Sequence, residues 1–227
     1  MPSIFLPVAE AYDRWSSFYD AYDNPMVFMA SEIVRRSLVP NVVGQDVFEF
    51  GCGTGRNLAM LEAAGAKSLT GCDLSDGMLA VARGKSPKLR LFQHDMATQP
   101  VSDVPPRSMD LVLFSLTLEH VEDLAGPLIQ ARRMLRPTGS VAIIEIHPFL
   151  SLTGLAAHFD EGEDEVRMPA FPHQFQDYMN VFPMAGLRVE VCREWRPVDA
   201  GNPPPLQGLK RGPEFPLTLQ FLLVPAL

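Results

Sequence analysis

Three glycines at alternate positions mark the stretch of this chain best suited to hold a ligand. They are Gly51, Gly53 and Gly55, and they follow an apolar run, residues 46–50, that predicts a strand. Because glycine has no Cβ atom, such a loop turns tightly and lets a ligand lie directly against the backbone. The helix predicted to follow would point free N–H groups at a carboxylate or phosphate. Several classes of cofactor site use loops of this kind, so the neighbouring residues must decide between them.

An acidic residue stands at the end of each of three successive predicted strands. Glu49 precedes the glycines, Asp73 ends the second strand and Asp95 follows the third. Asp73 lies about 20 residues beyond Gly51, the spacing at which a βαβ unit places a carboxylate on a ribose diol. Parallel strands end at one edge of a sheet, so the three carboxylates should converge there. They would suit a ligand with a ribose, an amine and positive charge, and would repel a pyrophosphate.

Together these motifs resemble those of the class I S-adenosylmethionine-dependent methyltransferases. The family's acid-x-Gly-x-Gly-x-Gly motif is matched by residues 49–55, its ribose-binding acid by Asp73, and its adenine-edge pair by Asp95 and Met96. Stretches 109–115, 118–121 and 134–139 are also similar to the family. The resemblance covers residues 10–147 in register, and several motifs in the right order make it specific.

The resemblance implies S-adenosyl-L-methionine as cofactor, with S-adenosyl-L-homocysteine as its product. The implied cofactor-binding residues are Tyr12, Trp15, Tyr19, Glu49, Gly51, Cys52, Gly53, Asp73, Leu74, Met78, Asp95, Met96 and Ser115. Glu49 would attract the methionine ammonium, Asp73 the ribose and Asp95 the adenine amine. The aromatic residues are included because an N-terminal segment caps the cofactor in this family. In residues 10–23 they recur at steps of three and four, which predicts one face of a helix.

Methyl transfer from a sulfonium is an in-line displacement, so the protein must chiefly hold the acceptor in line and away from water. A base is needed only where the acceptor must lose a proton. His147, after the fifth strand, and His173, in the segment that follows, are the candidate catalytic residues. His120 is expected to support the loop beside the cofactor, as in the resembled family. The acidic residues form no convincing metal-binding cluster, so no metal is predicted.

Alternating apolar segments predict the elements that position these residues. Strands are expected near 46–50, 69–73, 89–93, 109–114, 140–146, 187–195 and 216–224, and helices near 57–64, 75–83 and 123–135. The predicted fold class is α/β, with a Rossmann-like, seven-stranded, mostly parallel sheet, helices on both faces and a C-terminal antiparallel hairpin.

The length of 227 residues predicts a single methyltransferase domain, residues 1–227, in four parts. They are an N-terminal helical cap (1–40), a cofactor-binding core (41–147), a substrate lid (148–185) and a terminal strand pair (186–227). The lid is rich in aromatic residues, which favours an apolar or aromatic acceptor. Its acidic run, residues 160–165, predicts a solvated turn.

The composition favours a small-molecule partner. The chain has 19 Lys and Arg against 27 Asp and Glu, a net charge of −8, and lacks the basic cluster typical of nucleic-acid binding. No apolar run approaches the about 20 residues that span a bilayer, and the first residues lack the features of a signal peptide. We therefore expect a cytoplasmic protein with a small-molecule methyl acceptor and neither a nucleic acid nor a membrane as partner. The oligomeric state is left open.

The predicted function is S-adenosylmethionine-dependent methyl transfer to an oxygen or nitrogen of a small apolar or aromatic metabolite. One alternative is an NAD(P)-dependent oxidoreductase. Against it, Arg56 stands where that motif needs its third small residue, and Glu49 would face a pyrophosphate. The other alternative is a non-catalytic S-adenosylmethionine-binding module, because a cofactor site does not by itself demonstrate an acceptor site.

Overall fold

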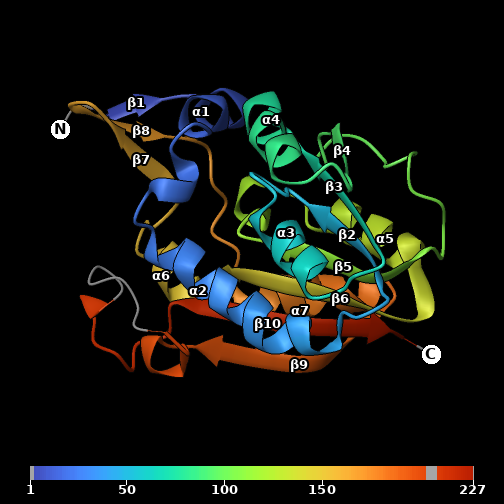
Figure 1. Cartoon of the computed structure of the whole chain (residues 1–227). Coiled ribbons are helices and arrows are strands. Elements are labelled where there is room, and N and C mark those ends of the chain that lie inside the picture. Colours follow the sequence, from blue (N-terminus) through green and yellow to red (C-terminus); the bar gives the residue numbers. More distant parts are fainter. Residues whose placement is uncertain (1–2, 203–208, 227) are drawn as a thin grey trace.

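A seven-stranded sheet forms the centre of the computed structural model, which describes residues 3–202 and 209–226 (Figure 1). Its strands are β2 (Asp46–Phe50), β3 (Ser68–Asp73), β4 (Leu89–Gln93), β5 (Met109–Ser115), β6 (Leu135–Ile146), β9 (Leu187–Trp195) and β10 (Thr218–Pro225). Their order is β4-β3-β2-β5-β6-β10-β9. β2 to β6 pair in parallel, and β10 runs antiparallel to both β6 and β9. The predicted fold class is confirmed.

The helices of the described residues are α1 (Val8–Trp15), α2 (Pro25–Ile33), α3 (Arg56–Ala63), α4 (Asp76–Lys85), α5 (Ala125–Met134), α6 (Pro148–Leu152) and α7 (Phe175–Met184). Helices cover both faces of this sheet, α2, α3 and α4 on one and α5 and α7 on the other, whereas α1 packs on α4. Short 3-10 turns lie at Tyr19–Ala21, Val39–Asn41, Leu118–His120 and Pro197–Asp199, and a π-helical turn at Val34–Leu38 extends α2. Side chains satisfy free N–H groups at several helix starts: Asn24 accepts from Met26 and Val27, Ser75 from Met78, and His147 from Phe149. The helices predicted after β2, β3 and before β6 are therefore present within a residue or two of their expected bounds.

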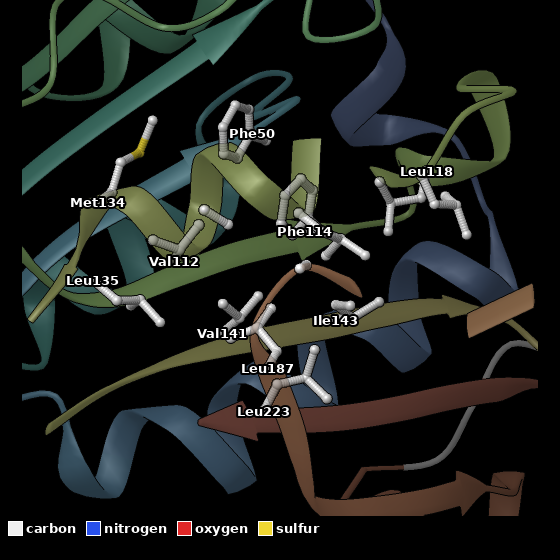
Figure 2. Packing of buried hydrophobic residues seen from close by; sticks show 14 of the residues in the cluster. Phe50, Val112, Phe114, Leu118, Met134, Leu135, Val141, Ile143, Leu187 and Leu223 are labelled. Carbon is white, nitrogen blue, oxygen red and sulfur yellow. The ribbon is translucent and has the colours of Figure 1, made fainter. Parts of the chain in front are cut away.

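The core lies on the two faces of the sheet. α2, α3 and α4 contribute to one apolar cluster, and α5 and α7 to the other. Figure 2 shows the second cluster, where Phe50, Phe114 and Ile143 from neighbouring strands meet Leu187 and Leu223 of the terminal strands. All five residues of β2 are buried, as expected of a strand covered on both faces.

Helix α7, inside the expected lid, belongs to this core. Its Tyr178 and Phe182 are almost fully buried, and both pack on Phe221 of β10, with ring centroids 5.5 and 5.0 Å apart. Some of the aromatic residues in 148–185 therefore bury α7 against the sheet. Composition alone could not distinguish these core residues from residues of a substrate lid.

A second, three-stranded sheet was not predicted. β1 (Ser3–Phe5) pairs in parallel with β8 (Asp164–Arg167), which forms a hairpin with β7 (His158–Glu161). The acidic run makes this hairpin and its turn. The expected N-terminal helix is also shorter than its aromatic spacing suggested, since α1 ends at Trp15 and a 3-10 turn carries Tyr19. In Figure 1 this small sheet and α1 lie together beside α4.

Candidate functional site

The glycine loop after β2 has the backbone that its sequence predicts. Gly51, Gly53 and Gly55 have φ angles of +61°, +52° and +72°, a region that side chains other than glycine rarely adopt. At Gly51 an added Cβ atom would also lie 2.0 Å from Oγ1 of Thr117. The loops after β2 and β5 therefore pack directly against each other, and the first cavity described below opens beside them.

Twelve of the thirteen predicted cofactor-binding residues line this one cavity. They are Tyr12, Tyr19, Glu49, Gly51, Cys52, Gly53, Asp73, Leu74, Met78, Asp95, Met96 and Ser115. The thirteenth, Trp15, does not line it. Its ring is 1% exposed and stacks on Phe159 at 4.7 Å, because α1 ends at this residue and turns its ring toward the β7–β8 hairpin. The structure thus brings the strand-end acids and the glycine loop together; their contact with a ligand stays a prediction.

Backbone donors orient the carboxylate of Asp73. Oδ2 accepts a hydrogen bond from the Gly53 N–H at 2.7 Å, and Oδ1 accepts one from the Ser75 N–H at 2.9 Å. Burial raises the pKa of this carboxyl, while these two N–H groups oppose the rise. The carboxylate thereby links the glycine loop to the start of α4, and each of its oxygens keeps a further lone pair for a ligand hydroxyl.

Glu49 presents an unsatisfied oxygen. The Asn57 Nδ2 amide donates to Oε1 at 2.7 Å, whereas Oε2 is buried and has no partner among the residues that the structure describes. Burial, with a smaller contribution from the nearby Asp73 charge, raises the pKa of Glu49 to about 8. A cationic donor in the cavity would pair with Oε2 and favour the ionised carboxylate.

The third acid, Asp95, is held by its own turn. Oδ1 accepts from the Ala97 N–H at 2.9 Å and Oδ2 from the Thr98 hydroxyl at 2.8 Å. The local turn orients the side chain, and the pairing of β4 with β3 brings this turn to the cavity.

The cap is fastened onto the cofactor-binding core by side chains that the sequence reading missed. Asp13 of α1 accepts from the Ser75 hydroxyl at 2.6 Å and from the Gly77 N–H at 2.8 Å, at the start of α4. Asp20 accepts from the Thr54 hydroxyl and from Arg56, at 2.8 and 2.9 Å. Both aspartates lie in the segment 10–23 that was expected to form the cap, but their sequence gave no signal of these partners. They hold the aromatic residues of the cap over the cavity.

His120, which was expected only to support the loop beside the cofactor, itself lines the first cavity. Its Nδ1 lies 2.8 Å from the Pro169 carbonyl oxygen, which can only accept, so Nδ1 carries a proton. Its Nε2 lies 2.9 Å from the Tyr12 hydroxyl and, in neutral histidine, accepts from it. The pair therefore provides a basic nitrogen behind a hydroxyl at the cavity wall. The only sequence signal was the position of His120 in the turn after β5.

The two predicted catalytic histidines do not line this cavity. His147 is fully buried, where its Nδ1 accepts from the Phe149 N–H at the start of α6 and its Nε2 lies 3.2 Å from Glu194. The Nε2 of His173 lies 2.7 Å from the Val121 carbonyl oxygen, behind the cavity wall. The structure therefore brings neither histidine to this cavity. His147 follows β6 at the expected edge of the sheet, but it caps α6 and its ring is buried in the core.

Across residues 3–202 and 209–226, no group of three or more His, Cys, Asp or Glu side chains is arranged to hold a metal ion. None of the helices in the same ranges is both long and apolar enough to cross a membrane.

Comparisons with known proteins identify the class that this fold and cavity define. Residues 48–143 match the family model described as a methyltransferase domain. The chain is 22% identical to the S-adenosylmethionine-dependent methyltransferase from Mesorhizobium loti, with a TM-score of 0.66 over 87% of this chain and 99% of that one. It is 21% identical to DhpI in its S-adenosylhomocysteine complex, with a TM-score of 0.68 over 96% and 95% of the two chains. At these identities the structural likeness shows the fold.

Curated relatives agree with this class. The demethylmenaquinone methyltransferase of Tropheryma whipplei is 26% identical over 145 residues, which are 62% of this chain and 60% of that protein. The chain thus spans about three fifths of the length of such relatives. Residues 48–143 thus match a methyltransferase domain, and the chain is similar in sequence and in fold to S-adenosylmethionine-dependent methyltransferases. The resemblance drawn from its motifs is confirmed.

Proposed function

We propose that this protein transfers a methyl group from S-adenosylmethionine to an oxygen or nitrogen of a small apolar or aromatic metabolite. The observation that carries the proposal is the buried Oε2 of Glu49, which has no partner in the described part of the chain and lies in the same cavity as Asp73 and the glycine loop. The three carboxyl groups fit the cofactor: Glu49 would hold its ammonium, Asp73 its ribose hydroxyls and Asp95 its adenine amine. When bound, S-adenosylmethionine would supply an electrophilic methyl group with a neutral thioether as leaving group.

A second cavity gives the acceptor a place beside the first. It has a volume of about 280 Å³, near the lower end of the range for small-ligand sites. Tyr12, Tyr19, Val27 and Leu116 line both cavities. Leu116 has a φ of +54°, and such strained non-glycine residues cluster at functional sites. Two cavities that share walls would let an acceptor approach the methyl group away from water.

Two residues of the chain can also take up the proton that an acceptor hydroxyl loses. In this proposal the acceptor gives its proton to the Tyr12 oxygen while the Tyr12 hydroxyl passes its own proton to Nε2 of His120. Burial raises the pKa of Tyr12 well above its ordinary value, so tyrosinate is not the resting base. His120 is therefore the base, with Tyr12 between it and the acceptor. An acceptor that attacks as a neutral amine would need Tyr12 and His120 only to remove its proton after the methyl transfer.

The two alternatives predict different ligands. An oxidoreductase would bind NAD⁺, whose pyrophosphate would lie against Glu49, so the buried carboxyl argues against it. A binding module would hold the cofactor without turnover, and the second cavity favours an enzyme over such a module.

Calorimetric titration with S-adenosylhomocysteine, and with NAD⁺ in parallel, tests the proposal. Micromolar binding of the first and none of the second is expected. Binding of NAD⁺ alone would overturn the cofactor assignment. Binding of S-adenosylhomocysteine with no turnover across a broad panel of acceptors would favour the non-catalytic module.

Replacing Asp73 with alanine is expected to lower the affinity for S-adenosylhomocysteine at least about tenfold, about 1.4 kcal/mol, because the ribose loses a charged hydrogen-bond acceptor. The measurement is the same titration, on protein whose thermal unfolding is still cooperative. Asp103→Ala, at an exposed position away from both cavities, is the control and should bind as the natural protein does. Unchanged affinity in folded Asp73→Ala would remove Asp73 from the site.

A further inference from the structure

The second cavity, read as the acceptor site of the proposed function, has an apolar interior and a charged rim. Side chains from α1, α2, α6, the loop after α6 and the end of β6 line its interior, among them Trp15, Leu150 and Leu155. Lys210 and Arg211, on the loop before β10, are exposed and line the same cavity. If the apolar part of a ligand lies inside the cavity, the end of the ligand nearest the solvent would lie beside these two cations.

The charges around the cavity favour an anion at its rim. Asp23 is the one carboxylate among the exposed lining residues, against the two cations Lys210 and Arg211. Glu119 lies in the interior, where burial raises its pKa and its Oε2 accepts from the Ala157 N–H at 3.2 Å. Within the described ranges neither cation is paired with a carboxylate. The rim thus has a surplus of positive charge, in a chain whose net charge is −8.

A buried donor in the wall gives a second indication. The indole Nε1 of Trp15 is buried and lacks a hydrogen-bond acceptor among the residues that the structure describes. An unpaired buried N–H group costs about 1–3 kcal/mol. Since Trp15 lines the second cavity, a ligand oxygen could satisfy this group, whereas a purely hydrocarbon ligand could not. The walls therefore favour an aromatic body that carries oxygen.

We propose that the second cavity binds an aromatic acceptor bearing an anionic group, such as a hydroxylated aromatic carboxylate. The ring lies in the apolar interior, its hydroxyl lies toward Tyr12 and Leu116 at the shared wall, and its carboxylate pairs with Lys210 and Arg211. The cavity volume of about 280 Å³ suits a small acceptor of this kind.

Three phenols of nearly equal size test this assignment by calorimetry, with and without S-adenosylhomocysteine. They are 4-hydroxyphenylacetate, an anion; 4-hydroxyphenylethanol, which is neutral; and tyramine, a cation. The anion is expected to bind about tenfold more tightly than the neutral phenol. In the double variant Lys210→Gln/Arg211→Gln that advantage should vanish while binding of the neutral phenol stays unchanged. Lys88→Gln/Arg188→Gln, two exposed cations outside both cavities, is the matched control and should keep the advantage.

Each other outcome overturns the assignment. Tighter binding of tyramine would mean that Asp23 and Glu119 select a cation instead. Equal binding of all three, or of none, would remove the rim cations from recognition. The proposed function is judged separately: if the anion binds in the Lys210- and Arg211-dependent manner but S-adenosylhomocysteine never does, the anion site stands and methyl transfer fails.

Discussion

Replacing Glu49 with glutamine is expected to stabilise the ligand-free protein and, at the same time, to weaken its binding of S-adenosylhomocysteine. The buried carboxyl has a pKa of about 8 against an ordinary value of 4.5. Glutamine keeps an oxygen to accept from Asn57 and removes the charge that burial disfavours. It also removes the anion that would pair with the cofactor's ammonium. One substitution should therefore move stability and binding in opposite directions.

The sign of the stability change follows from proton linkage. Between about pH 4.5 and pH 8 the folded protein keeps the Glu49 proton and the unfolded chain has lost it, so this group lowers the free energy of unfolding as pH rises through that window. Glu49→Gln removes this loss. The gain should be small near pH 5 and on the order of 2 kcal/mol at pH 8, or a rise of about 4–8 °C in Tm. Binding should weaken by about 10- to 100-fold, as expected for a lost charged hydrogen bond.

Thermal unfolding at pH 5 and pH 8, with a titration at pH 8, measures both effects. Glu145→Gln is the matched control, because burial also raises the pKa of Glu145 to about 8. Glu145 accepts from the Thr117 and Leu118 N–H groups through one oxygen, which glutamine retains, and it does not line the first cavity. The Glu145→Gln substitution should also stabilise the protein but leave the binding of S-adenosylhomocysteine unchanged. Equal binding losses in both variants would show that Glu49 acts only through the fold.

The strand-end residues could be predicted because their positions depend on local sequence. An apolar strand followed by alternating glycines fixes where β2 ends, so Glu49 had to lie at the edge of the sheet. The Ser75 cap does the same for Asp73. The parallel order of the strands then brings both residues to one cavity. Local signals of this kind sufficed for the sheet and for bringing twelve of the thirteen predicted residues to the first cavity.

Contacts between distant segments could not be predicted in this way. His120 meets Tyr12 and Pro169, which are 108 and 49 residues away in the chain, and nothing in its own stretch indicates either partner. The pairing of β1 with β8 is equally remote and draws Trp15 toward the small sheet. His147 lies away from the first cavity for the opposite reason, because its side chain caps α6 within its own stretch of the chain.

Replacing His120 with glutamine is expected to lower kcat for a phenolic acceptor by about 10²-fold or more, because general-base catalysis typically contributes about 10²–10⁴-fold. Glutamine can still bond to Tyr12 and Pro169 but cannot take up a proton. Tyr12→Phe removes the hydroxyl between acceptor and base and should have a similar effect. If both act in one relay, the double variant should be no slower than the slower single variant, because residues that act as a unit are not additive.

Initial rates of S-adenosylhomocysteine formation with saturating acceptor measure these effects. His173→Gln, which replaces a histidine behind the cavity wall, is the control and should stay within about twofold of the natural protein. Losses that multiply in the double variant would mean that Tyr12 and His120 act independently, with Tyr12 serving to position the acceptor. An unchanged kcat in His120→Gln would mean that the acceptor needs no base, as for a neutral amine. The acceptor's own chemistry therefore decides whether this buried hydroxyl–imidazole pair acts in catalysis, and the rates of the three variants would reveal it.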